Sequence, residues 1–382
     1  MSGLNRRLAS ISAMERAAAR RIPRFAFEYL QGGIGHEACL AANRRALDAV
    51  EITPHYMLDE TFEPDLSVSL FGKTWPLPFA PSPIGPSGLM WPRSAERVAA
   101  GATCHGLPIG LSSYATSSLE EIAAIAGDKL WFQLYCTIDP AIENDMIDRA
   151  EAAGCKTMII TVDIPTVTRR ERDAENGLSV PPHFDLGTLR DMATRPRWCL
   201  EMLKAGIPRF RNLDRYVPGG SSPAAAAVFL SDMIDGRVTT DKLGRIRERW
   251  KGNLIVKGIL TPEEALRAKQ IGADAVAVSN HGGRQFDATP TSVAVLPEIR
   301  EAVGPDYPLV ADGGVRSALD VMRLIACGTD FVLMGRAFVY AAAAAGTDGV
   351  EHLIKLVKTE LRQNMLQAGC ADYRELRTRR QT

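Results

Sequence analysis

The sequence predicts an α/β protein built as a (β/α)8 TIM barrel, with helices before the first strand and a long insertion after the fourth. Eight short apolar runs recur between residues 77 and 334, and helical patterns separate most of them. Strands that alternate with helices form a parallel sheet, and eight such strands fit a closed barrel. An open doubly wound sheet is the alternative, but no GxGxxG motif follows the first run, which weakens a nicotinamide-binding interpretation.

Bulk composition narrows the functional class. The chain has 382 residues, within the range of a barrel with insertions, and we expect one domain over residues 1–382. Lys+Arg and Asp+Glu are both 45, so no net charge favours a nucleic-acid partner. The seven cysteines include no CxxC pair, which favours reduced thiols in a cytoplasmic protein over a disulfide framework or a metal site. The longest apolar run, 337–345, is far shorter than the ~20 residues that span a membrane.

Residues 1–50 are predicted to be helical. Pro23 precedes the segment 24–30, whose apolar residues have helical spacing until Gly32 and Gly33 end it. Tyr29 near this end is either a core aromatic or a hydroxyl presented to a site.

The barrel strands and helices follow in order along the chain. The expected strands are 77–80, 107–111, 130–134, 158–162, 254–256, 275–278, 309–311 and 331–334. The expected helices between them include 118–126, 140–153, 262–271 and 318–326.

Polar and glycine residues follow each predicted strand. Active sites of barrels lie at the carboxyl ends of the strands, so these residues are the candidates for chemistry. They are Pro83, Ile84, Gly85, Ser112, Tyr114, Gln133, Tyr135, Thr161, Asp163, Lys257, Ser279, His281, Arg284, Asp312, Gly313, Gly314, Arg316, Gly335 and Arg336.

The segment 278–287, VSNHGGRQFD, carries the clearest chemical signal. His281 has the side chain best suited to act as a base near neutral pH, and Arg284 offers the planar fork that binds a carboxylate. Two glycines between them let the backbone turn sharply beside a ligand. The pair suggests removal of a proton or hydride from a small acid, whereas the alternative is a loop whose His and Arg cap a helix.

The last two strand ends predict a phosphate site. The segments 312–316 (DGGVR) and 335–336 (GR) provide backbone N–H groups, small residues and two guanidinium groups. Loops after strands 7 and 8 often hold a phosphate in barrels.

A long connection, about residues 174–240, interrupts the barrel pattern. It is expected to be irregular and rich in Pro, Gly and Ala, and residues 188–216 contain seven Arg/Lys against three Asp/Glu among apolar residues that include Trp198, Ile207 and Phe210. It is either a solvated lid or a surface that contacts a membrane or an electron acceptor.

The motifs taken together resemble those of the FMN-dependent L-2-hydroxy acid dehydrogenases and oxidases. The resemblance covers about residues 23–370, centres on SNHGGRQFD, and includes WFQLY (131–135), TVDIPT (161–166), RRERD (169–173), VKGIL (256–260), DGGVRS (312–317) and GRAF (335–338).

The resemblance implies a role for each candidate residue. His281 would be the base, Asp163 the carboxylate that stabilises its imidazolium, and Tyr135 a hydroxyl near the reacting oxygen. Arg284, Arg170, Tyr29 and Tyr114 would bind substrate, and Lys257 would stabilise negative charge on the reduced flavin. The remaining predicted FMN contacts are Pro83, Ile84, Gly85, Ser112, Gln133, Thr161, Ser279, Asp312, Gly313, Gly314, Arg316, Gly335 and Arg336.

Gly85 stands where the family's oxidases usually have Ala. We interpret this as an open space beside the flavin and as favouring a dehydrogenase that reduces a quinone or cytochrome. The alternatives are an oxidase that forms hydrogen peroxide and, in another enzyme class, an FMN-barrel isopentenyl isomerase. The isomerase would not need His281, Arg284 and Arg170. The resemblance further implies a homotetramer. Of the two interpretations of the insertion, the lid is slightly favoured, and the other would give a cytoplasmic protein a peripheral contact with the inner face of the membrane.

Overall fold

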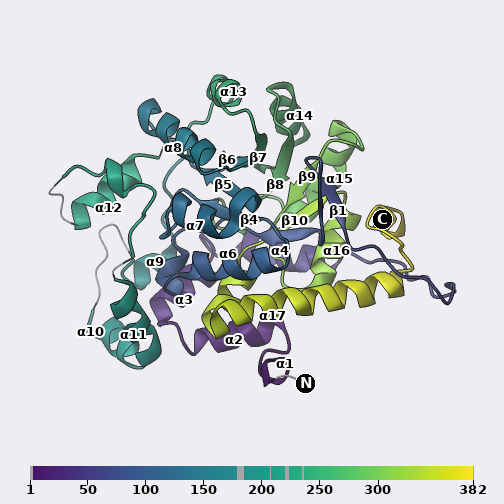
Figure 1. Cartoon of the computed structure of the whole chain (residues 1–382), viewed down its shortest axis with the longest axis horizontal. Coiled ribbons are helices and arrows are strands. Elements are labelled where there is room, and N and C mark those ends of the chain that lie inside the picture. Colours follow the sequence, from purple (N-terminus) through teal and green to yellow (C-terminus); the bar gives the residue numbers. More distant parts are fainter. Residues whose placement is uncertain (1–2, 179–184, 207, 220–222, 235, 382) are drawn as a thin grey trace.

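The predicted barrel is present. The computed structural model describes residues 3–178, 185–206, 208–219, 223–234 and 236–381. Their central sheet has eight parallel strands in the order β3-β10-β9-β8-β7-β6-β5-β4, and β3 packs beside β4, so that the barrel is nearly closed. Helices surround the strands (Figure 1).

The barrel strands agree closely with the predicted apolar runs. Four of them match to the residue: β5 (Leu130–Leu134), β8 (Ala275–Val278), β9 (Leu309–Ala311) and β10 (Phe331–Met334). The others are β3 (Phe79–Pro81), β4 (Ile109–Ser112), β6 (Thr157–Thr161) and β7 (Asn253–Ile259), shifted by one or two residues or longer than predicted. Every residue of β4, β5, β6 and β8 is buried, because helices cover the outside and side chains fill the inside.

A small hairpin closes the amino-terminal mouth of the barrel. Its strands β1 (Val68–Leu70) and β2 (Lys73–Trp75) place Leu70 and Trp75 in one apolar cluster with inward-facing residues such as Trp131 and Phe331. The rings of Trp75 and Trp131 pack edge to face with centroids 6.2 Å apart. This plug makes the carboxyl ends of the strands the open end.

Helices connect and flank the strands. They are α1 (Gly3–Arg7), α2 (Ile11–Ala19), α3 (Arg24–Gln31), α4 (Ala38–Asp48), α5 (Ser87–Met90), α6 (Ser94–Cys104), α7 (Leu119–Ala126), α8 (Pro140–Ala152), α13 (Thr240–Arg249), α14 (Pro262–Gln270), α15 (Ser292–Val303), α16 (Ala318–Ala326), α17 (Arg336–Ala368) and α18 (Leu376–Arg379). The run of 33 residues in α17 contains a kink at Ala345 and Gly346, and its two parts lie along α2 and α6 (Figure 1).

The insertion is more regular than the sequence suggested, and the expectation of irregular chain was wrong for its described parts. They contain α10 (Leu186–Ala193), α11 (Pro196–Ala205) and α12 (Pro223–Asp232), which gather with the preceding α9 (Glu171–Glu175) on one side of the molecule (Figure 1). Asp185 caps α10 by accepting from the Thr188 N–H, and Pro196 begins α11. Ile207 lies outside the described residues.

Within the described part of the chain, we find no helix that combines the length and the apolar character needed to cross a bilayer.

Candidate active site

A histidine–aspartate pair lies at the centre of the open end. His281, which follows β8, places Nδ1 3.0 Å from Oδ1 of Asp163, which follows β6. Burial would raise the pKa of Asp163, but the positive charges of His281 and Lys257 and the hydrogen bond from His281 lower it below its ordinary value. When His281 is neutral, Nδ1 would donate to the ionised carboxylate and Nε2 would be left as an acceptor, which is the arrangement of a general base.

The loop that carries His281 has an unusual backbone. His281, Gly282 and Gly283 have φ values of 56°, 63° and 76°, so three successive residues are left-handed. A Cβ on Gly283 would lie 2.7 Å from the Leu40 nitrogen, so this position requires glycine. The His281 N–H donates to the Ser279 hydroxyl at 3.1 Å, which helps to hold a conformation that is costly for a residue with a side chain.

Glycine also brings Asp163 to its place. Gly258 lies in β7 at a register shift, with φ of 103°, and a Cβ there would lie 2.6 Å from the Asp163 Cβ. The bulge therefore lets the carboxylate approach the barrel rim.

Tyr135, after β5, adds a hydroxyl beside the base. Its oxygen lies 3.5 Å from His281 Nε2. Burial, and then the charge of Asp163, raises the Tyr135 pKa, so the hydroxyl stays protonated and can donate.

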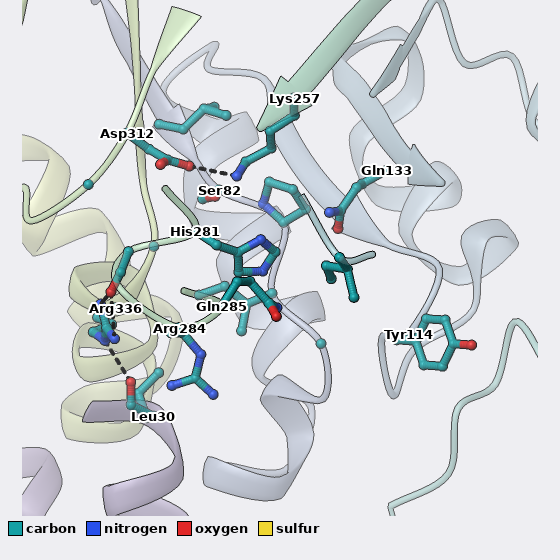
Figure 2. A pocket seen from close by; sticks show the side chains of 18 of the residues that line it. Leu30, Ser82, Tyr114, Gln133, Lys257, His281, Arg284, Gln285, Asp312 and Arg336 are labelled. Carbon is teal, nitrogen blue, oxygen red and sulfur yellow. Dashed lines mark hydrogen bonds and ion pairs between the residues drawn. The ribbon is translucent and has the colours of Figure 1, made fainter. Parts of the chain in front are cut away.

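Lys257 of β7 belongs to a buried polar triad. Its Nζ donates to the Ser279 hydroxyl at 2.7 Å and lies 3.0 Å from Asp312 Oδ2, while Ser279 donates to Asp312 Oδ1 at 2.6 Å. Burial would lower the Lys257 pKa, but Asp312 and Asp163 raise it, so the amine is cationic. Figure 2 shows the ion pair between Lys257 and Asp312.

Two half-buried arginines meet the end of helix α3. Arg284 donates to the carbonyls of Tyr29 and Gly32, each at 2.7 Å, and its guanidinium lies 5.0 Å from the centre of the Tyr29 ring. Arg170 approaches the same ring at 5.8 Å and pairs with Asp173 at 3.3 Å. Burial and the charge of Arg170 lower the pKa of Arg284 to about 10, which still leaves it cationic at neutral pH. Asp173 pairs with Arg170, whereas Arg284 donates to backbone carbonyls, and this excess of positive charge suits an incoming anion.

Arg336, which was predicted to bind phosphate, also donates hydrogen bonds to backbone carbonyls. Its guanidinium donates to the carbonyls of Leu30 at 2.7 Å and Gly32 at 2.9 Å, and it reaches the Gly282 carbonyl at 3.3 Å (Figure 2). It therefore ties α3 to the loop of His281. Arg316, the other predicted phosphate residue, lies over the Tyr340 ring at 5.7 Å.

A single pocket gathers most of the predicted site residues. It has a volume of about 250 Å³, and its lining includes Tyr29, Pro83, Ile84, Gly85, Tyr114, Gln133, Tyr135, Arg170, Lys257, His281, Arg284, Asp312, Gly313, Gly314, Arg316, Gly335 and Arg336. Four predicted residues lie behind this lining, namely Ser112, Thr161, Asp163 and Ser279.

The sequence missed part of the pocket wall. Phe210 and Ile234 of the insertion line it, as do Ile164 and Met90. An aromatic residue in a basic segment was the available signal for Phe210, and nothing local distinguished Ile234.

The interpretation of Gly85 as an open position was wrong. A Cβ on Gly85 would lie 2.5 Å from the Tyr114 carbonyl oxygen and 3.0 Å from the Tyr114 Cβ. Glycine is needed here because the backbone of the neighbouring loop passes so close.

Comparison with known proteins is consistent with this geometry. A family model described as FMN-dependent dehydrogenase matches residues 18–381. The chain is 38% identical over 359 residues to an L-lactate dehydrogenase of Alcaligenes faecalis, covering 94% of each protein. It is 39% identical over 370 residues to an L-lactate dehydrogenase of Bartonella tribocorum, covering 97% of this chain and 96% of the relative.

Solved structures agree over nearly the whole chain. The crystal structure of a monotopic membrane protein, (S)-mandelate dehydrogenase, superposes with a TM-score of 0.92 at 31% identity, covering 98% of this chain and 99% of the other. A mandelate oxidase superposes with a TM-score of 0.82 at 34% identity, covering 97% of each chain.

Proposed function

Because the chain belongs to the FMN-dependent dehydrogenase family, we propose that it oxidises a small L-2-hydroxy acid of the lactate or mandelate type to the 2-oxo acid and passes the electrons to a quinone or cytochrome. The observation that carries the proposal is the position of His281. His281 lines the same pocket as Arg284, with Nε2 beside the Tyr135 hydroxyl, while Asp163 orients its other nitrogen. A base beside a carboxylate-binding group is what this oxidation requires.

The residues of the pocket fit FMN. Gln133 donates to Thr161 at 2.6 Å, but its buried Oε1 has no hydrogen-bond partner among the residues that the structure describes. An N–H of a flavin ring would supply that partner. Lys257 would face the part of the ring where negative charge gathers, with Ser279 and Asp312 holding the lysine in place.

The phosphate of FMN has a matching cradle. Gly313 and Gly314 have φ values of 111° and 80°, which aim backbone N–H groups in a way that residues with side chains rarely adopt. Arg316 and Arg336 line the same pocket and supply positive charge. Pro83, Ile84, Gly85, Ser112 and Gly335 complete the set that we propose for the cofactor.

The catalytic steps follow from these positions. Arg284 and Arg170 bind the substrate carboxylate, and the Tyr29 ring beneath both guanidiniums keeps them in place. His281 Nε2 takes one proton from the substrate, and the Asp163 carboxylate stabilises the resulting imidazolium. Tyr135 donates to the substrate oxygen. FMN held by the residues above would supply the acceptor for the two electrons and the second proton that the hydroxy acid loses.

We propose that residues 1–382 form one domain with an insertion at about 174–240. The larger of the two apolar clusters among the described residues includes residues from Leu8 to Leu376, which supports this division. Limited proteolysis checks it, since a single domain should yield no stable half-length fragment.

We further propose a homo-oligomer, a tetramer by family resemblance. The large apolar side chains of Tyr56 and Met57 are 70% and 94% exposed, which is consistent with an interface. Light scattering on the purified protein measures the mass directly.

The insertion is proposed to rest on the inner face of the membrane as a peripheral contact. Leu186, Leu189, Leu200 and Leu203 are 51–85% exposed on α10 and α11. The Arg and Lys side chains within residues 188–216 would bind anionic lipid headgroups. A similar structure is described as a monotopic membrane protein, which supports this location.

An absorption spectrum and anaerobic reduction test the main proposal. The purified protein should show flavin bands that bleach on addition of L-lactate or L-mandelate under nitrogen. A quinone analogue should then restore the bands faster than oxygen does. Rapid reoxidation by oxygen with formation of hydrogen peroxide would instead establish the oxidase, and failure to bleach would refute hydroxy acid oxidation.

A further inference from the structure

The pocket has two chemically different ends. Arg284 and Arg336 lie on one side of His281, and Tyr114 lies on the other side with its hydroxyl directed away from the histidine (Figure 2). The pocket lining also includes the apolar residues Ile164, Phe210 and Ile234, of which Phe210 packs on Tyr114. A substrate whose carboxylate lies at the arginines and whose C2 lies at the histidine would therefore direct its side chain toward the apolar end.

Aromatic rings extend without a break from the base to the insertion. The Tyr135 ring packs edge to face on Tyr114, with centroids 5.6 Å apart and planes at 75°. Tyr114 in turn packs on Phe210, with centroids 5.4 Å apart and planes at 68°. Aromatic rings favour this geometry among themselves, so a further ring placed here would find matching partners.

The apolar end offers few groups that could bind a polar side chain. The Tyr114 hydroxyl already donates to the Leu230 carbonyl of α12 at 2.9 Å. The Tyr135 hydroxyl faces His281. A polar substrate side chain would thus lose hydrogen bonds to water without replacing them.

The insertion holds Phe210 firmly against Tyr114. Asn212, two residues later, is fully buried, accepts from the Leu119 N–H at 2.6 Å and reaches the carbonyls of Ser112 and Ser117 at 3.4 Å. Ile234 pairs with Thr137 in an isolated β-bridge. The wall is therefore anchored at both ends to the loops that follow β4 and β5.

We propose that Phe210 is a specificity-determining residue, which with Tyr114 selects 2-hydroxy acids that carry an aromatic side chain over those that carry a methyl group. Asn212 acts as the positioning residue that fixes Phe210. This inference rests on the proposed oxidation of a 2-hydroxy acid and names the substrate class of that same site.

Steady-state kinetics with two substrates test the inference. L-Mandelate and L-lactate are compared with an artificial dye acceptor for the wild type, Phe210→Ala, Phe210→Tyr and the control Leu203→Ala, whose side chain is 80% exposed on the same insertion. The wild type should have a kcat/KM for mandelate at least ~10-fold above that for lactate. In Phe210→Ala, kcat/KM for mandelate should fall about 10-fold, mainly because KM rises, and kcat/KM for lactate should fall less than about twofold. Phe210→Tyr and Leu203→Ala should keep the wild-type preference.

Two results would overturn the inference. One is a wild type that prefers lactate, and the other is an equal loss for both substrates in Phe210→Ala. Melting temperature and flavin content show whether Phe210→Ala folds. If it does not, Phe210→Leu removes the ring with less loss of volume. The ratio of kcat/KM for mandelate to kcat/KM for lactate then decides in the same way. Reduction of the flavin by neither acid would refute the proposed function itself, whereas reduction with the wrong preference refutes this inference alone.

Discussion

Nδ1 of His281 lies 3.0 Å from Oδ1 of Asp163, although 118 residues separate the two in the chain. The contact depends on two backbone irregularities, the left-handed conformation at His281 and the bulge at Gly258. The first is costly by itself, of the order of 1–3 kcal/mol for a non-glycine residue in the left-handed region, whereas the second requires a glycine. Because both irregularities occur at this contact, we infer that the local backbone holds His281 and Asp163 in position.

His281→Gln should abolish reduction of the flavin by substrate while leaving the flavin bound. Loss of a general base costs at least ~10²-fold in rate. Stopped-flow reduction under nitrogen measures the rate, and the absorption spectrum measures flavin content. His281→Asn is the matched variant, since asparagine tolerates the left-handed backbone at this position. Near-normal reduction in both variants would place the base elsewhere.

Arg284→Lys should raise KM and lower kcat although the charge is kept. The lysine cannot reach the carbonyls of both Tyr29 and Gly32 and still present a planar fork to a carboxylate. The kinetics of Arg267→Lys, on the outer helix α14, provide a control for the same substitution away from the pocket. Wild-type kinetics in both Arg284→Lys and Arg170→Lys would mean that the carboxylate site is misassigned.

The fold was predictable because buried parallel strands are short apolar runs, and the run at 275–278 ends at the residue where β8 ends. Local signals for the insertion helices were present, since Asp185 and Pro196 are helix-start residues of α10 and α11, but the sequence prediction did not use them. No local pattern placed Phe210 in the pocket, because its position depends on long-range contacts such as those of the buried Asn212. The site residues that follow the strands were easier to predict, since topology alone brings the ends of parallel strands together.

Asp173 should make product binding dependent on pH. Burial raises the pKa of this carboxyl above its ordinary 3.8, against the lowering effects of Arg170 and Arg284. As pH rises through the range above 3.8, Asp173 ionises and competes with the ligand carboxylate for Arg170, so affinity for the 2-oxo acid should fall. Asp173→Asn should bind it several-fold more tightly and without this pH dependence.

Titration of the flavin absorbance with the 2-oxo acid measures that affinity. Glu175→Gln, an exposed position on the same helix α9, is the control and should titrate like the wild type. Weaker binding in Asp173→Asn would show that the carboxylate positions Arg170 rather than competing for it.

Leu186→Glu combined with Leu203→Glu should reduce binding to vesicles that contain anionic lipid. Both side chains are at least 80% exposed, and charge at these positions opposes insertion into the lipid interface. Salt should weaken wild-type binding, because it screens the attraction of the basic residues. Leu266→Glu on α14 serves as the control, and co-sedimentation measures each protein. Absence of the wild type from vesicles at every salt concentration would leave the insertion as a plain lid.

Gly85→Ala should act through Tyr114. The new Cβ would lie 2.5 Å from the Tyr114 carbonyl oxygen and 2.9 Å from its carbonyl carbon, and backbone atoms cannot turn aside as a flexible side chain would. Overpacking of this kind costs about 1–3 kcal/mol, part of which should appear as lower stability. Displacement of Tyr114 should also raise KM, because the ring contacts both Tyr135 and Phe210.

Oxygen reactivity distinguishes this mechanism from an open space beside the flavin. If the glycine matters only for the approach to Tyr114, reoxidation of the photoreduced flavin by oxygen should stay within about twofold in Gly85→Ala while KM rises. Stopped-flow reoxidation and steady-state kinetics measure the two effects separately, with Gly244→Ala as a control, since a Cβ there meets nothing within 4 Å. A large gain in the oxygen rate with an unchanged KM would show instead that the residue controls oxygen access, as its place in the sequence first suggested.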